Sequence, residues 1–74
     1  MAPRNAEQNA QLREEARERL LHSALALFAE KGYANTSISQ IARHSGMAKG
    51  SVYHYFSGKE DLLLQIFDML DEIA

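Results

Sequence analysis

The chain has no cysteine and only one proline among its 74 residues. The lack of cysteine excludes structural disulfides and thiolate metal sites, and it suits a reducing cytoplasm. No apolar run approaches the roughly 18 residues that a membrane span needs, and the start MAPRNAEQNAQ lacks the apolar segment of a secretory signal. The sequence therefore predicts a soluble, cytoplasmic protein with no membrane partner.

Acidic residues are absent from residues 36–59, although the whole chain carries a net charge of -2. This segment contains Arg43, Lys49 and Lys59, whereas the last part of the chain is acidic. A solvated surface could show the same charge pattern. A basic segment of 24 residues inside an acidic chain nevertheless favours DNA as a partner.

A chain of this length can hold one small domain with a modest core. Residues 1–10 are polar and aperiodic, and we interpret them as a flexible N-terminal arm. Apolar residues recur at helical spacing from Gln11 to Lys31, and Gly32 stands where a left-handed helix cap is expected. The apolar residues of this first helix are Leu20, Leu21, Ala24, Leu27 and Phe28.

Three further helices are predicted after Gly32. Thr36 or Ser37 can cap a second helix that runs to about His44, and a third spans about 49–56. The fourth begins at Ser57 and Glu60, which have the spacing of a capping box. Its expected packing stripe is Leu62, Leu63, Ile66, Phe67, Leu70 and Ile73, with Leu64 and Met69 off the stripe. No strand pattern is visible, so the fold class is all-α, a small helical bundle.

The second and third helices meet the needs of a helix-turn-helix. Ala42 provides a small side chain where the helices cross, and Gly46 allows the turn. Apolar anchors are available at Ile41, Met47 and Val52. In the third helix, only Val52 and Phe56 are obvious core residues, so the remaining side chains can face DNA.

Several motifs together resemble the N-terminal DNA-binding domain of TetR-type transcriptional regulators. They are A-x-x-L-F-A-E-K-G-Y, T-S-I-x-x-I-A, S-G-M-A-K-G-S-V-Y-H-Y-F and x-x-K-E-x-L-L, and they cover about residues 17–70. The resemblance implies a homeodomain-like fold whose third helix enters the major groove. It assigns residues 11–74 to this domain, with the ligand-binding and dimerisation domain of the family absent and the fourth helix as the start of the connection.

The resemblance also implies contacts for particular residues. Ser37, Tyr53 and Lys59 correspond to positions that contact phosphate, and Tyr55 lies where an aromatic or histidine approaches phosphate. Base-edge or mixed contacts fall to Lys49, Gly50, Ser51 and His54. Ser45 and Met47 depart from the commoner alanine and valine of the turn.

The partners that the family implies are a palindromic operator in double-stranded DNA, a second copy of the full-length protein and a small-molecule effector bound by the absent domain. The expected role is that of a ligand-responsive repressor that occludes a promoter. No cofactor is expected.

Other interpretations remain at this stage. Tyr53 and Tyr55 could be aromatics at the edge of the core, and the apolar fourth helix could make the chain a protein-interaction module. A Ser51, His54 and Asp61 triad would lack a cleft that excludes water, so enzymatic activity is not expected. His22, His44 and His54 have no companions at ligand spacing, so no metal site is predicted.

Overall fold

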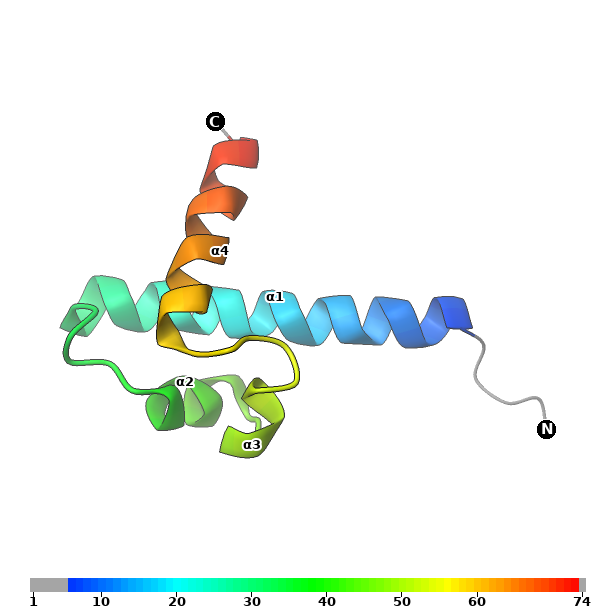
Figure 1. Ribbon diagram of the computed structural model, residues 1–74, viewed down its shortest axis with the longest axis horizontal. Helices are drawn as coiled ribbons and strands as arrows, with labels where there is room; N and C mark the ends of the chain where they lie inside the picture. The colour runs from blue at the N-terminus through cyan, green and yellow to red at the C-terminus, as the bar shows by residue number, and fades with distance from the viewer. Residues whose placement is uncertain (1–5, 74) are drawn as a thin grey trace.

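The computed structural model describes residues 6–73, and the side chains of residues 10–72. Four helices and no strand occur in residues 6–73, namely α1 (Ala6–Lys31), α2 (Ile38–Ser45), α3 (Lys49–Val52) and α4 (Lys59–Ile73). The two short helices lie on one side of the long α1, while α4 crosses α1 and projects on the other side (Figure 1). The all-α prediction is confirmed.

Helix α1 begins earlier than the sequence pattern indicated. It starts at Ala6, so residues 6–10 of the predicted flexible arm are helical, and that part of the prediction is wrong. Alanine, glutamate and glutamine predominate there, and their helix propensity outweighs the lack of an apolar period. Residues 1–5 of the predicted arm lie outside the described residues. The predicted end is confirmed, because Gly32 has φ 88° and its N–H donates to the Phe28 carbonyl at 2.9 Å.

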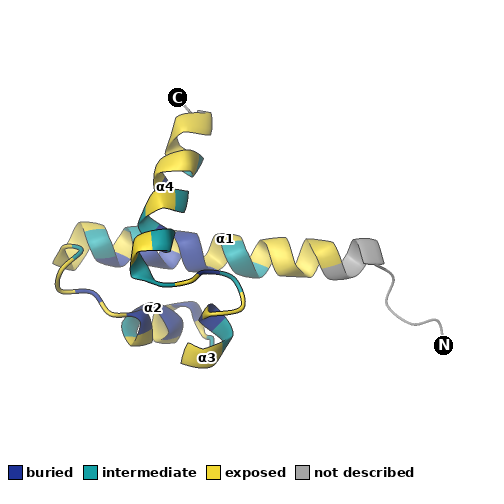
Figure 2. Cartoon of the chain, in the orientation of Figure 1, coloured by how far each residue is buried: buried dark blue, intermediate teal, exposed yellow. Residues whose placement is uncertain are grey.

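The core lies where α1, α2 and α4 meet. Its buried apolar residues come from all four helices and from Phe56, which follows α3. They are Leu20, Leu21, Ala24, Leu27, Ile38, Ile41, Ala42, Val52, Phe56, Leu62 and Ile66. The described N-terminal turns of α1 and most of the projecting part of α4 are exposed (Figure 2). One compact cluster therefore holds the domain together, and both long helices extend beyond it.

Local hydrogen bonds define both ends of α2. Ser37 is the N-cap: its hydroxyl accepts from the Gln40 N–H at 3.1 Å, and its own N–H donates to Gln40 Oε1 at 2.9 Å. Thr36, the alternative cap, is instead buried and donates its hydroxyl to the Gly32 carbonyl at 2.9 Å. At the other end Gly46 has φ 76°, as the predicted turn requires.

Helix α3 is shorter than predicted. It covers Lys49–Val52 rather than 49–56, and a hydrogen-bonded turn follows, in which the N–H groups of Tyr55 and Phe56 donate to the Val52 carbonyl. Glycine, serine, valine, tyrosine and histidine have modest helix propensity, and Ala48 provides no side-chain cap. The local sequence therefore does not sustain the predicted two turns of helix.

The start of α4 also differs from the prediction. The predicted capping box of Ser57 and Glu60 does not form, because α4 begins at Lys59 and the Gly58 carbonyl accepts the first helical bond, from the Leu62 N–H at 3.1 Å. This register places Asp61 in the third helical position. Asp61 Oδ2 accepts from the Ser57 N–H at 3.0 Å. The acidic side chain that stabilises this end is therefore one residue later than expected.

Part of the predicted packing stripe of α4 is exposed. Leu62 and Ile66 are buried and Met69 packs against them, but Phe67 is 56% exposed and Leu70 is 42% exposed. Because α4 crosses α1 instead of running along it, only a narrow face of α4 reaches the core (Figure 1). Phe67 follows Ile66 by about 100° around the helix and leaves that face. The predicted burial of Phe67 and Leu70 is wrong, and the Ile73 side chain lies outside the described residues.

Candidate nucleic-acid interface

Apolar side chains on both sides of the turn between α2 and α3 pack into the core. Ile41, Ala42 and Val52 are buried, and Met47 packs against the core. The N–H of Met47 donates to the Ala42 carbonyl at 2.8 Å, and that of Gly46 donates to the Arg43 carbonyl at 3.1 Å. This pair of bonds is a Schellman cap, which reverses the chain directly after α2. The predicted turn register is confirmed.

The two unusual residues of the turn fit this arrangement. Ser45 is 6% exposed, and its hydroxyl donates to the Ala42 carbonyl at 3.0 Å. A buried hydroxyl with a hydrogen-bond partner costs little. Met47 is half-buried and its flexible side chain packs against the core. Neither departure from the family pattern disturbs the turn.

Most side chains of α3 and the turn after it face solvent, as predicted. Lys49, Gly50 and His54 are exposed, Tyr53 is 51% exposed and Ser51 is half-buried. A Cβ added at Gly50 would meet no atom within 4 Å. Packing within this chain therefore does not require glycine at this position.

Tyr55 differs from Tyr53. It is half-buried and packs against the core cluster, so the interpretation of Tyr55 as an aromatic at the core edge has structural support. Its outer surface still lines a hollow beside α1. An amphipathic tyrosine can serve both environments.

Ser37 lies at the exposed N-terminus of α2. Its oxygen accepts the capping bond from Gln40, and its hydroxyl hydrogen is still available as a donor. The first N–H groups of a helix carry partial positive charge, which favours an anion nearby. Ser37 can therefore stabilise α2 and also donate to a phosphate.

Lys59 has an internal partner that the sequence did not indicate. Its Nζ donates to the Tyr33 carbonyl at 2.8 Å and lies 4.2 Å from the centre of the Tyr33 ring. Tyr33 in turn stacks on Phe28, with ring centres 5.1 Å apart. An ammonium group has three donors, so two remain after the bond to Tyr33. Lys59 ties the start of α4 to the connector after α1 and keeps donors for another contact.

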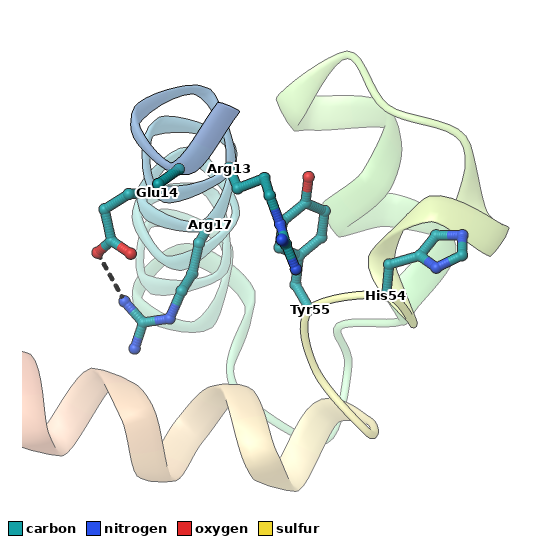
Figure 3. A pocket seen from close by; sticks show the side chains of 6 residues that line it. Arg13, Glu14, Arg17, His54 and Tyr55 are labelled. Atoms are coloured by element: carbon teal, nitrogen blue, oxygen red, sulfur yellow. Dashed lines mark hydrogen bonds and ion pairs between the residues drawn. The ribbon is translucent and has the colours of Figure 1, made fainter. Parts of the chain in front are cut away.

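The structure also contains a hollow lined by two arginines, which was not predicted from the sequence. Six residues line a hollow between α1 and the turn after α3, namely Ala10, Arg13, Glu14, Arg17, His54 and Tyr55 (Figure 3). Arg17 donates to Gln65 of α4 at 3.0 Å and pairs with Glu14 at 3.2 Å. The signal that could have revealed the hollow is the spacing of Arg13 and Arg17, which places them on one side of a helix.

The structure does not assemble the other constellations considered from the sequence. Within residues 10–72 no hydrogen bond joins the side chains of Ser51, His54 and Asp61, and Asp61 instead accepts from the Ser57 backbone N–H. No group of three His, Asp or Glu side chains in the described part of the chain is placed to hold a metal ion. His44 instead shares a hydrogen bond of 2.9 Å with Ser23 of α1.

None of the described helices is both long enough and apolar enough to cross a membrane. A short helix, a glycine turn and a second short helix with an exposed basic and aromatic surface define a helix-turn-helix domain. The chain belongs to the tetR family of bacterial regulatory proteins, whose family model matches residues 20–66. The domain is thus the DNA-binding domain of a transcriptional regulator of this family.

Individual relatives agree with this assignment. The chain is 36% identical over 66 residues to the HTH-type transcriptional regulator AcrR of Shigella flexneri, covering 89% of this chain and 29% of AcrR. It is 46% identical over 54 residues to the uncharacterized HTH-type transcriptional regulator YxaF of Bacillus subtilis, covering 72% of this chain and 28% of YxaF.

Solved structures show the same fold. A mutant of HlyIIR superimposes with a TM-score of 0.74 at 37% identity, over 77% of this chain and 32% of that protein. The fatty acid degradation regulator FadR of Bacillus halodurans superimposes with a TM-score of 0.68 at 37% identity, over 69% of this chain and 27% of FadR. The chain thus spans less than a third of the length of these relatives.

Proposed function

We propose that this domain binds double-stranded DNA sequence-specifically and serves a ligand-responsive repressor. The observation that carries the proposal is the exposed surface of α3 and the turn after it, where Lys49, Gly50, Tyr53 and His54 face solvent in a segment without acidic residues. Such a surface fits the negative potential and the base edges of the major groove.

The proposal divides the eight site residues into base contacts and phosphate contacts. Lys49, Gly50, Ser51 and His54 contact base edges or their immediate surroundings, and Ser37, Tyr53, Tyr55 and Lys59 contact phosphates. Phosphate contacts fix the register of a protein on the duplex, whereas base contacts select the sequence. Tyr55 is less exposed than Tyr53, so it offers less surface for a phosphate contact.

In the full-length regulator, two copies would place α3 in successive major grooves about 34 to 36 Å apart, on a palindromic operator. A small-molecule effector bound outside this domain would change that separation and release the DNA. The regulator would act in the cytoplasm without a cofactor of its own and without enzymatic activity.

The decisive test of specificity is selection from randomised duplexes. Wild-type and Lys49→Ala chains are fused to the same dimerising partner, and the recovered sequences are compared. Loss of Lys49 should relax the preference at one position per half-site and cost about 1 to 3 kcal/mol on the selected operator, with a smaller loss on random DNA. Recovery of the same motif with equal information at every position would limit Lys49 to a phosphate contact.

One observation favours a second candidate, a helical protein-interaction module. Leu64, Phe67 and Leu70 of α4 are 55%, 56% and 42% exposed, which leaves apolar surface available to a partner. Salt separates the two functions. Binding through several phosphates weakens steeply as salt rises, whereas an apolar helix interface does not.

A further inference from the structure

We propose that Arg13, on the N-terminal part of α1, contacts a DNA phosphate that flanks the bases read by α3. This inference rests on the proposed function, since it extends the same DNA-binding surface from the helix-turn-helix onto α1. The hollow described above joins the two regions, because Arg13 and Arg17 line it from α1 while His54 and Tyr55 line it from the turn after α3 (Figure 3).

The charges of the hollow single out Arg13. Arg17 is held by Glu14 at 3.2 Å and by Gln65 at 3.0 Å, and its guanidinium lies 5.9 Å from the centre of the Phe56 ring. Glu14, the one acidic residue of the lining, is therefore already paired. Arg13 is exposed and forms no ion pair with any side chain of residues 10–72. The hollow thus keeps one unbalanced positive charge.

The chemistry of the lining fits a phosphodiester. A guanidinium presents paired donors that match the oxygens of a phosphate. The Tyr55 hydroxyl and the His54 ring can add neutral donors. The His54 ring points away from Arg13 (Figure 3). This arrangement places the proposed base-reading side at one edge and Arg13 at the other.

A DNA phosphate suits this hollow better than a small free anion. Arg13 and His54 are both exposed, so the lining does not enclose a ligand as a dedicated anion site does. A duplex whose major groove holds α3 carries phosphates on either side of that groove. Neighbouring phosphates of one strand are separated by about 3.4 Å along the helix axis. The hollow lies between the turn after α3 and α1, so a DNA strand that contacts this turn would also pass close to the hollow. Arg13 therefore extends the footprint beyond the bases that are read.

The test compares the wild-type chain with Arg13→Gln and with Arg19→Gln as a matched control. Arg19 is also exposed on α1 but lies six residues further on, about 240° around the helix, and it does not line the hollow. Binding is measured by fluorescence anisotropy on a duplex that the wild-type chain enriches from randomised DNA, and on a scrambled duplex of the same length. Salt is varied in each titration.

We expect Arg13→Gln to weaken binding to both duplexes by the same factor, roughly tenfold at low salt. The slope of log K against log salt should fall by about 0.9, the value for one lost phosphate contact. Arg19→Gln should change neither quantity. In a second series, a neutral methylphosphonate replaces single flanking phosphates. One position should weaken the wild type and leave Arg13→Gln unaffected.

Equal affinities and salt slopes for the two variants would overturn the inference while leaving the proposed function intact. Failure of the wild-type chain to bind any duplex would instead overturn the proposed function, and this inference with it. Inorganic phosphate at constant ionic strength is the third arm. Saturable changes in the Tyr55 NMR signals at millimolar phosphate, with no difference between the variants on DNA, would assign the hollow to a free anion and also overturn the inference.

Discussion

Helices α2 and α3 adjoin the same turn but are stabilised by different means. The eight residues of α2 have a complete capping box at Ser37 and Gln40, a Schellman cap at Gly46 and four buried residues. The four residues of α3 have no side-chain cap and one buried residue, Val52. Local interactions therefore define α2, whereas α3 depends on the core beneath Val52 and Phe56.

This difference is consistent with separate roles. Side chains that cap or pack a helix are already engaged, as the Ser37 oxygen is. In the segment that carries most of the proposed DNA contacts, Lys49, Tyr53 and His54 are exposed and neither cap nor pack a helix. Its position is instead set by two apolar anchors and by the turn before it. The proposed recognition surface is thus held in place by residues that lie outside it.

The largest expected effect comes from removal of the second anchor. Phe56 is 2% exposed, and Phe56→Ala should lower the free energy of unfolding by about 3 to 5 kcal/mol, because it leaves a cavity in the core. Urea denaturation followed by circular dichroism measures this loss. Tyr53→Ala, at a 51% exposed position of the same segment, should change stability by no more than about 0.5 kcal/mol. Similar losses for both variants would contradict the anchoring role of Phe56.

The next test isolates the backbone of the turn. An alanine Cβ would meet nothing within 4 Å at either Gly46 or Gly50, but only Gly46 has a positive φ, 76°. Gly46→Ala should therefore cost about 1 to 2 kcal/mol through the left-handed conformation alone. Gly50→Ala should raise stability by up to about 1 kcal/mol, since alanine favours helix. Thermal denaturation compares the pair, and equal shifts would show that the turn conformation is not what stabilises α2.

The two proposed roles of Ser37 can be separated by two substitutions. Ser37→Ala removes the cap and should cost about 1 kcal/mol of stability. Ser37→Asp retains a capping oxygen and should keep stability near the wild-type value, but it introduces a negative charge where a phosphate is expected. Thermal melts and DNA titrations are measured on both variants. Wild-type DNA affinity for Ser37→Asp would exclude a phosphate contact at this position.

A further small loss of stability is expected at Lys59, which ties the start of α4 to the connector after α1. Lys59→Met keeps the apolar stem and loses the bond to the Tyr33 carbonyl and the contact with its ring. The expected cost is about 0.5 to 1 kcal/mol. If Lys59 also contacts phosphate, the salt slope of DNA binding should fall by about one unit on all sequences. An unchanged slope with reduced stability would leave Lys59 with its internal role alone.

Much of the candidate site was predictable from short-range pattern. The turn at Gly46 and the exposure of Lys49, Gly50, Tyr53 and His54 follow from spacing and residue type, because each depends on neighbours within a few positions. The cap of α2 was narrowed to Thr36 or Ser37, and the structure selects Ser37. The Lys59 contact with Tyr33 and the hollow between Arg13 and His54 were not predicted. These pairs are distant in the chain, and no local rule relates them.

The sequence alone determined the helical class, the order of the four helices and the register of the turn, since hydrophobic period, capping residues and glycine act locally. Tertiary structure decided how much of each helix is used. The crossing of α4 over α1 selected Leu62 and Ile66 for the core and left Phe67 and Leu70 exposed. A stripe shows which face of a helix can be buried, but the crossing angle and the length of its partner decide how far that burial extends.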